Sequence, residues 1–303
     1  MPYLRLLRPH QWVKNVFVFA GLVFGHRLED PRSVWLSLLG FALMCCVSSA
    51  IYVVNDIRDR EEDRLHPRKC RRPIASGEVT VGAASIIAIV LLVGGLGASA
   101  LLSMPFFYVV VGYVVLQFLY NWSFKHAVIL DVVTIGLGFV LRAVAGGFLI
   151  DVKISPWLML CTFTLCLFMG FSKRRCELSA MSENGSSAGK HRKTLALYTP
   201  DLLNHMTTLT AGIAIMSFML YTIDKQVEAP FEKQHLVYTV PIVVYAVFRY
   251  AVLVEHGMVD GPTDVVLKDR PFQAAIGLWV VAAYLVVYQS AAVKNVWGGL
   301  TGS

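Results

Sequence analysis

Three regularly spaced carboxylates make residues 55–63 the segment most suited to chemistry. Asp56, Asp59 and Asp63 follow Asn55 at the spacing i, i+3, i+7, so a helical continuation places all three on one face. Carboxylates that lie side by side repel one another unless a cation lies among them. Mg²⁺ favours oxygen ligands and commonly joins a carboxylate or two to substrate phosphates, with Mn²⁺ as the alternative metal. The spacing predicts a metal site whose ligands are the three aspartates.

A basic segment, residues 66–73, follows these acids directly and contains Lys69 and Arg72. Two simpler interpretations stay open. The acids could pair with the neighbouring arginines in a solvated loop, and the bases could be ordinary charge at a membrane surface. Carboxylates that hold a metal beside bases that contact phosphate form a complete diphosphate site, however. The order of the two segments favours that site.

Arg142 is a charge within an apolar stretch, residues 132–150. A charge at such depth in a membrane segment is costly and usually functional. Asp131 precedes it by three helical turns, which predicts a polar stripe along one face. A structural buried ion pair is the alternative. Glycines on the same segment predict close helix approach or room for a substrate.

Polar residues also stand at the ends of two other apolar stretches. Tyr120 and Lys125 end the stretch 104–124, whereas Lys173, Arg174 and Glu177 follow the stretch 156–172. Each could be a simple interfacial anchor. All these ends are expected on the same side as the aspartates, which predicts a role in substrate binding.

Long apolar blocks must position these groups. The chain has 303 residues, of which 56% are hydrophobic and only 16% charged, which argues against a soluble domain. The blocks approach or exceed the ~20 residues that span a bilayer as a helix. We therefore expect an all-α membrane protein, with about nine transmembrane helices in one bundle and one integral domain over 1–303. The predicted spans are 12–26, 34–54, 79–102, 104–124, 127–150, 156–172, 205–223, 236–254 and 272–292.

The distribution of positive charge predicts the orientation. Of the 27 Lys and Arg residues, 20 fall on the side that holds the N-terminus and six on the other, with Arg142 inside a span. Cytoplasmic loops carry the excess of such residues. The N-terminus is thus expected in the cytoplasm, and the loops 55–78 and 173–204 should carry the active-site motifs there. This predicts a multi-pass protein of the inner cell membrane.

The motif residues resemble the UbiA superfamily of intramembrane prenyltransferases. The signature N-D-x-x-D-x-x-x-D is met by residues 55–63, and His66-Pro67, Lys69 and 72–77 (Arg-Pro-Ile-Ala-Ser-Gly) follow as in that family. The position of the motif after the second span agrees as well. The resemblance covers most of the chain.

One departure points to a subgroup. Typical members carry a second acidic motif after span six, but this chain has Lys173 where the first aspartate should be. The chain is similar instead to the polyprenyl-phosphate phosphoribosyltransferases, through residues 8–15, 141–147, 173–174, 249–250 and 267–270. Arg175 stands where tyrosine is expected, a minor mismatch.

The subgroup resemblance implies a phosphoribosyltransferase of the decaprenyl-phosphate type. Phosphoribosyl diphosphate (PRPP) would be the donor, a polyprenyl phosphate the acceptor, and the product would feed arabinose donors for cell-wall glycans. No nucleic-acid partner is expected, and a homo-oligomer is left open. In this interpretation Asn55 and the three aspartates are catalytic, and the substrate-binding residues are Lys14, Asn15, Lys69, Arg72, Tyr120, Lys125, Arg142, Lys173, Arg174 and Glu177.

Two rival functions remain. A UbiA-type prenyltransferase would attach a prenyl diphosphate to an aromatic or quinone acceptor. A transporter would use Asp131 and Arg142 as a substrate relay, and such proteins often show inverted repeats and broken spans. No repeat is evident by eye in this sequence.

Overall fold

The computed structural model describes residues 1–66, 69–183, 195–224, 233–256, 265 and 268–288. The chain forms two compact units. Unit 1 comprises Met1–Phe124 and Gly138–Lys153, and unit 2 comprises Lys125–Leu137 and the residues from Ile154 onward. The prediction of a single integral membrane domain stays a prediction.

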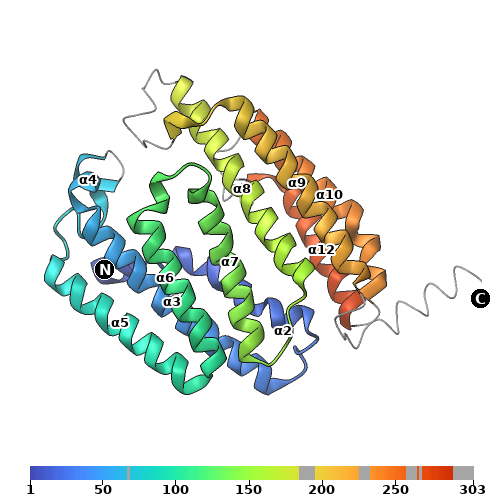
Figure 1. Cartoon of the computed structure of the whole chain (residues 1–303), viewed down its shortest axis with the longest axis horizontal. Coiled ribbons are helices and arrows are strands. Elements are labelled where there is room, and N and C mark those ends of the chain that lie inside the picture. The colour runs from blue at the N-terminus through green and yellow to red at the C-terminus, as the bar shows by residue number, and fades with distance from the viewer. Residues whose placement is uncertain (67–68, 184–194, 225–232, 257–264, 266–267, 289–303) are drawn as a thin grey trace, which may run out of the picture. The chain divides into compact units, whose positions relative to one another are not determined.

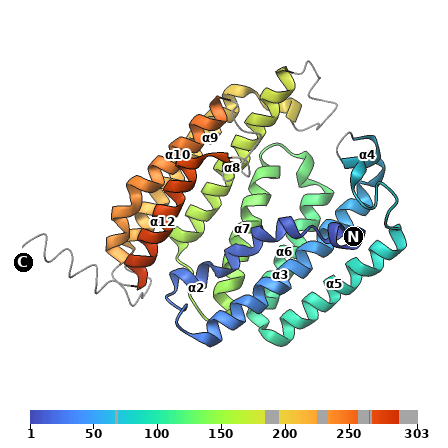
Figure 2. The same ribbon diagram turned by 180° about the vertical axis from the view of Figure 1, so that it is seen from behind.

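Unit 1 is built around a long central helix, α3 (Pro31–Arg58), against which α5 (Val81–Leu102) and α6 (Met104–Trp122) pack (Figure 1). The short helices α1 (Pro2–Leu7) and α2 (Ala20–Phe24) lie at the ends of a 3₁₀ helix, η1 (Pro9–Phe19). Figure 2 shows this N-terminal segment running from the N label to α2. After α3 come α4 (Arg60–Leu65) and η2 (Lys69–Arg71).

Helix α7 (Leu130–Leu149) contributes its first two turns to unit 2 and the rest to unit 1. Unit 2 continues with α8 (Pro156–Glu183), which packs along α9 (Pro200–Ile223). Two further helices, α10 (Val240–Glu255) and α12 (Arg270–Tyr288), pack against each other. Short 3₁₀ turns connect these elements: η3 (Phe124–His126), η5 (Leu195–Leu197) and η6 (Lys233–Thr239).

N-cap side chains fix where several helices begin. Asp30 accepts hydrogen bonds from the backbone N–H groups of Arg32 and Ser33 at 3.1 and 3.3 Å, directly before Pro31. Thr80 and Ser103 cap α5 and α6 in the same way. A side-chain oxygen here satisfies a backbone donor that has no partner within the helix.

Eight helices in the described ranges are long and apolar enough to cross a membrane, which confirms the predicted all-α membrane class. They correspond to the second through ninth predicted spans. The first predicted span, 12–26, falls instead on η1 and α2. A 3₁₀ helix rises about 2.0 Å per residue, so these 16 residues extend roughly 30 Å, the thickness of the hydrocarbon core.

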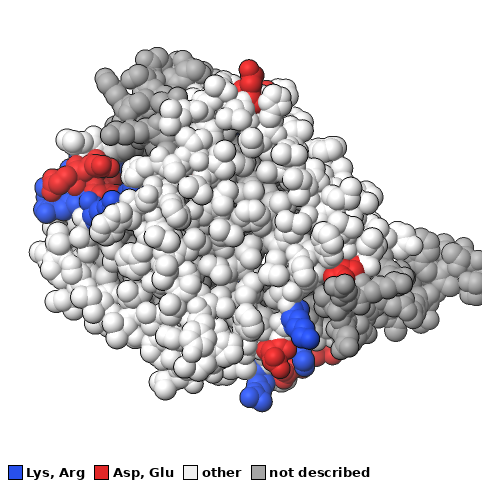
Figure 3. Space-filling model, viewed as in Figure 1, with Lys and Arg blue, Asp and Glu red and all other residues white. Residues whose placement is uncertain are grey.

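The charged side chains on the drawn face of unit 1 lie at its ends. On the face drawn in Figure 3, one group covers α4 and another lies near α2, with a surface free of charged side chains between them. A band without charged side chains suits helices that a bilayer surrounds, because a charge is costly there. The group over α4 adjoins the predicted aspartate motif.

Candidate active site

The length of α3 carries the aspartate motif beyond its apolar part. A helix of 28 residues extends about 42 Å, whereas the hydrocarbon core of a bilayer is about 30 Å thick. Asn55 and Asp56 lie in the last turn of α3, and the helix ends at Arg58. Asp59 stands at the break, and α4 then contributes Asp63. The predicted unbroken helix is thus interrupted at Asp59.

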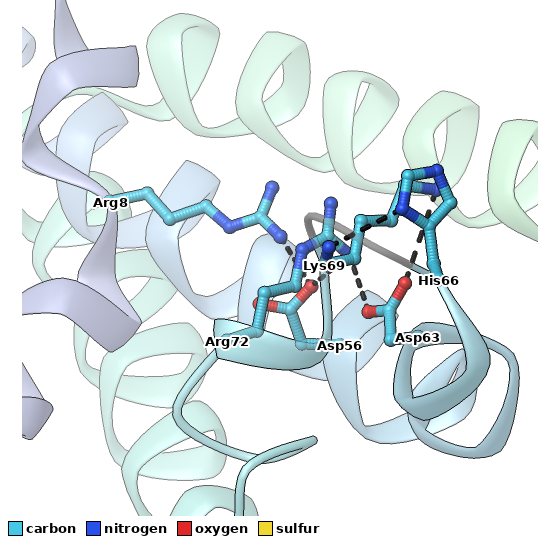
Figure 4. A network of polar contacts seen from close by, with 6 residues as sticks. All are labelled: Arg8, Asp56, Asp63, His66, Lys69 and Arg72. Atoms are coloured by element: carbon cyan, nitrogen blue, oxygen red, sulfur yellow. Dashed lines mark hydrogen bonds and ion pairs between the residues drawn. The ribbon is translucent and has the colours of Figure 1, made fainter.

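The break turns Asp63 back toward Asp56, and one arginine joins them. Arg72 Nη1 lies 3.1 Å from Asp56 Oδ1 and 2.6 Å from Asp63 Oδ2. Lys69 Nζ lies 3.9 Å from Asp63 Oδ1. Figure 4 shows these side chains converging, with Arg8 reaching Asp56 from the opposite direction. Both carboxylates are almost fully buried, whereas the cations are partly exposed to solvent.

Arg8 is a site residue that our sequence reasoning did not select. Its guanidinium pairs with Asp56 and lies over the ring of Tyr52, 5.3 Å from the centroid. Its backbone is left-handed (φ 54°), between α1 and Pro9. The pairing spans 48 residues, so no local pattern revealed it. The only signal was its place in the family segment 8–15.

The region around Arg8, His10 and Lys14 in the N-terminal segment carries a positive potential. Burial, and then the neighbouring charges of Arg8 and Lys14, lower the pKa of His10 below its usual value. The neutral form of His10 is therefore favoured near pH 7. A surrounding that disfavours one more positive charge also favours an anionic ligand.

Apolar anchors and a tight turn hold Arg72 in place. Ile74 and Val79 are buried together with Leu6, Val53 and residues of α5. Arg64 Nε donates a hydrogen bond to the carbonyl of Ala75 at 3.2 Å. Gly77 has φ +82°, a conformation that glycine adopts without steric cost. These contacts fix the loop that follows Arg72.

The donor set suits a hard divalent cation, although an arginine lies where the carboxylates converge. Asp56 and Asp63 supply the oxygen ligands that Mg²⁺ prefers. No three His, Cys, Asp or Glu side chains come together as a potential metal group in the ranges that the structure describes. Because Arg72 contacts both carboxylates, a metal ion would fit between them only after the guanidinium had moved to another anion, such as a substrate phosphate.

Arg142 forms a separate buried cluster within unit 1. Its Nε donates to Asn15 Oδ1 at 2.8 Å, and its Nη2 donates to the Tyr113 hydroxyl at 2.7 Å. Its Nη1 donates to the Gly138 carbonyl at 2.8 Å. The structure thus joins two predicted binding residues, Asn15 and Arg142. Asp131, eleven residues earlier on α7, is too far along the helix to pair with Arg142 and has other partners.

Those partners form a buried network in unit 2. Arg174 Nε lies 3.0 Å from Asp131 Oδ2, and its Nη1 lies 2.6 Å from Glu177 Oε2. Tyr198 donates a hydrogen bond to Asp131 Oδ1 at 3.0 Å. Lys173, by contrast, is exposed and lies 4.0 Å from Glu177. Sequence reasoning selected the residues of α8 but missed Tyr198, which lies 67 residues from Asp131.

The profile of the UbiA prenyltransferase family matches residues 15–263, which span the two α3–α4 aspartates, their basic loop and most of unit 2. The chain belongs to the UbiA prenyltransferase family.

Two relatives that match nearly the whole chain carry the same activity name. The chain is 35% identical to a decaprenyl-phosphate phosphoribosyltransferase of Corynebacterium glutamicum, over 94% of this chain and 86% of that protein. It is 32% identical to the protein of the same name from Mycolicibacterium smegmatis, over 95% and 92% of the two chains. Both matches extend over nearly the whole sequence.

Solved structures of the family share the fold. A UbiA homologue from Archaeoglobus fulgidus, bound to GPP and Mg²⁺, superimposes with a TM-score of 0.71 at 21% identity, covering 95% of this chain and 99% of that one. The structure of the same homologue with DMAPP and Mg²⁺ gives the same TM-score. At this level of identity the likeness shows the fold alone.

The remaining predicted site residues of this UbiA-family chain lie on the α3–α4 segment, η1, α6 and η3. Asn55 and Asp59 belong to the α3–α4 segment, Lys14 is in η1, Tyr120 is in α6 and Lys125 is in η3. Their roles in binding stay predictions. Pro67 and Arg68 of the family motif, and residues 184–194 of the predicted loop 173–204, lie outside the described residues.

Proposed function

We propose that this chain transfers the 5-phosphoribosyl group of PRPP to a polyprenyl phosphate of the decaprenyl type and releases diphosphate. The observation that carries the proposal is the whole-length similarity to proteins named for this activity. The replacement of the second acidic motif by Lys173 supports it, because a lysine repels a metal ion but attracts phosphate. The lipid product would serve as a precursor of arabinose donors for the cell wall.

The paired aspartates would hold Mg²⁺, or Mn²⁺ in its place. Asp56 and Asp63 converge on one position, and Asp59, between them in sequence, is the third proposed ligand. A metal ion bound there would neutralise the diphosphate leaving group. Arg72, Lys69 and Arg8 already contact these carboxylates, so a small shift would bring them to diphosphate oxygens. Unit 1 is therefore the proposed donor site.

The reaction needs positioning and charge more than acid–base chemistry. The bond from ribose C1 to the diphosphate oxygen breaks with its electron pair, and an acceptor phosphate oxygen forms the new bond to C1. Positive charge develops on the ribose, as in glycoside hydrolysis. The acceptor is already anionic at neutral pH, so no general base is required. The chain's cations instead hold polyanions that would otherwise repel each other.

Other cations are assigned to the remaining phosphates. Lys173, on the exposed side of α8, suits either the lipid phosphate or the 5-phosphate of the donor. Arg142 and Lys14 are proposed as further positive groups of unit 1, with Asn15 orienting Arg142 through the 2.8 Å hydrogen bond. Tyr120 and Lys125 keep the substrate-binding role that the sequence predicts.

The proposal also includes the location of the protein and its orientation in the membrane. We place the chain in the inner membrane with its N-terminus and active site toward the cytoplasm, as the charge distribution predicts. Single cysteines at Ser76 and at Glu29, near opposite ends of α3, would test this in a cysteine-free background. An impermeant thiol reagent applied from outside should label Glu29→Cys only. Labelling of Ser76→Cys from that side would contradict the orientation.

One assay separates the proposed reaction from its rival. Purified protein in lipid vesicles would receive PRPP labelled in the ribose together with decaprenyl phosphate and Mg²⁺. Label should enter the lipid phase, and the Asp56→Asn variant should abolish the transfer. A parallel sample would contain a labelled prenyl diphosphate and an aromatic acid. Transfer in that sample alone would establish the aromatic prenyltransferase instead.

A further inference from the structure

Two adjacent basic residues of α8 have opposite surroundings. The Lys173 side chain is 53% exposed, and its Nζ lies 4.0 Å from Glu177 Oε1, a long distance for an ion pair. The Arg174 side chain is only 5% exposed and lies between the carboxylates of Asp131 and Glu177. An incoming phosphate can reach the lysine, whereas the arginine is already compensated by two anions.

Tyr198 completes the network behind Arg174. Its hydroxyl accepts a hydrogen bond from the Ile129 backbone N–H at 2.7 Å and donates one to Asp131 at 3.0 Å. Burial raises the pKa of Tyr198 to about 12, and the Asp131 carboxylate acts in the same direction. The hydroxyl therefore keeps its proton and remains a donor.

The backbone at Ile129 is held in an unusual conformation by this contact. Ile129 has φ +69°, and a β-branched residue rarely adopts the left-handed region. Such outliers persist where the surrounding structure over-determines them, and they cluster at functional sites. The contact with Tyr198 satisfies the Ile129 N–H at the start of α7.

Close packing makes this network rigid. Tyr198 is buried with Val132, Phe171, Leu195 and Leu203. A Cβ atom on Gly170 would lie only 2.5 Å from Val132 Cγ1, so α7 and α8 approach closely one turn before Arg174. The chain of contacts thus runs from the start of α7, through Tyr198 and Asp131, to Arg174 and Glu177.

We infer that Tyr198, Asp131 and Arg174 are positioning residues that hold Glu177, and through it Lys173, for a substrate phosphate. Lys173 is the residue that contacts the phosphate. Glu177 orients the lysine while Arg174 restrains Glu177 at 2.6 Å. This inference rests on the proposed function, because it assigns a phosphate-bearing substrate to unit 2.

A double-mutant cycle tests the coupling. Tyr198→Phe removes one hydroxyl, and Lys173→Ala removes the cation. Each variant should raise KM roughly tenfold for one of the two phosphate substrates, PRPP or decaprenyl phosphate, with a smaller change in kcat. The double variant should be no worse than Lys173→Ala, because Tyr198 acts through Lys173. The substrate whose KM changes identifies the phosphate.

Independent effects would overturn the inference. If the two single losses multiply in the double variant, Tyr198 has only a structural role. Tyr250→Phe is the matched control, because Tyr250 is equally buried in unit 2 and its hydroxyl has no hydrogen-bond partner in the described part of the chain. This control should leave both KM values unchanged. If Tyr198→Phe does not fold, it would be combined with Ile129→Gly, since glycine tolerates the positive φ.

A second measurement does not depend on catalysis. Competitive labelling with an amine-reactive reagent reports the local environment of Lys173 in the intact protein. The reactivity of Lys173 should change in Tyr198→Phe and stay unchanged in Tyr250→Phe. Unchanged reactivity in both variants would overturn the positioning role. Absence of phosphoribosyl transfer by the wild type would refute the proposed function, and the labelling result would still decide whether Tyr198 acts on Lys173.

Discussion

The two units each contain an arginine that contacts two carboxylates, and the two arginines differ in access to solvent. In unit 1, the Arg72 side chain is 26% exposed and contacts Asp56 and Asp63. In unit 2, the Arg174 side chain is 5% exposed and contacts Asp131 and Glu177. Both clusters lie toward the C-terminal end of a 28-residue helix, α3 or α8.

Because of this difference in exposure and charge, the ion pairs of Arg72 can exchange with a ligand, whereas those of Arg174 are fixed. Around Asp56 and Asp63, three cations face two carboxylates, and Lys69 and Arg72 reach solvent. These cations can leave for a substrate phosphate when a metal ion takes their place beside the buried carboxylates. Arg174 would have to leave a buried pair, which is strongly unfavourable. Unit 1 is therefore suited to binding and release, and the Arg174 cluster to holding a shape.

The largest expected effect is on turnover, and it follows from loss of the unit 1 carboxylates. Asp56→Asn or Asp63→Asn should lower turnover about a thousandfold or more, because the metal and its electrostatic stabilisation are lost. The melting temperature in detergent should change little, since the remaining cations are partly solvated. Chelation of divalent ions should give the same loss, and added Mg²⁺ should restore activity. Radioactive product formation and thermal melting measure the two effects.

The matched control for these variants is Glu61→Gln on α4, whose side chain is 74% exposed. It should retain wild-type turnover. Full activity in the presence of a chelator would contradict the metal assignment.

Loss of the unit 2 carboxylate should have the opposite profile. Asp131→Asn leaves Arg174 buried with a single anion, which should lower the free energy of unfolding by on the order of 3 kcal/mol. We expect the melting temperature to fall by several degrees, with activity reduced far less than in Asp56→Asn. Asp201→Asn, on the exposed first turn of α9, serves as the control. A stable but inactive Asp131→Asn protein would reverse our distinction between the two clusters.

A moderate effect is expected at Lys173, the exposed cation of unit 2. Lys173→Ala should raise the KM of a phosphate substrate about tenfold, the effect of losing one charge-assisted contact in a solvated place. Lys173→Asp should be worse, because it adds repulsion against the bound phosphate. Lys153→Ala, an exposed lysine of unit 1, should leave KM unchanged. If Lys173→Asp instead gained transfer from a prenyl diphosphate to an aromatic acid, the rival function would be favoured.

The sequence predicted the helices well because their apolar blocks are long. The predicted span 104–124 became α6 at Met104–Trp122, and 79–102 became α5 at Val81–Leu102. The span 34–54 was too short, since α3 runs from Pro31 to Arg58. The last turn of α3 is polar, so hydrophobicity alone did not include it in the predicted span. Asp30 and Pro31 marked the start of the helix. The first span was hardest to predict, because a 3₁₀ helix has no distinct apolar period.

The sequence predicted local clusters and missed distant partners. Asp56, Asp63, Lys69 and Arg72 lie within 17 consecutive residues, and the structure brings them together. Asp131 and Arg142, by contrast, are eleven residues apart on one helix, about 16 Å, which is too far for an ion pair. Each found partners on other elements. Such pairings depend on tertiary packing, which no spacing along the chain records.

The smallest expected effect concerns the ion pair between Arg5 and Glu78, which joins α1 to the loop before α5. Their side chains are 54% and 42% exposed, so solvent screens the attraction. The hydrogen bond from Arg5 lowers the pKa of Glu78, so any stability from the pair is present above the unfolded-state pKa and is lost as pH falls through the lower folded-state value. Glu78→Gln should therefore leave the melting temperature and turnover unchanged at pH 7. A fall as large as that of Asp131→Asn would show that exposure does not separate the exchangeable contacts of this protein from the fixed ones.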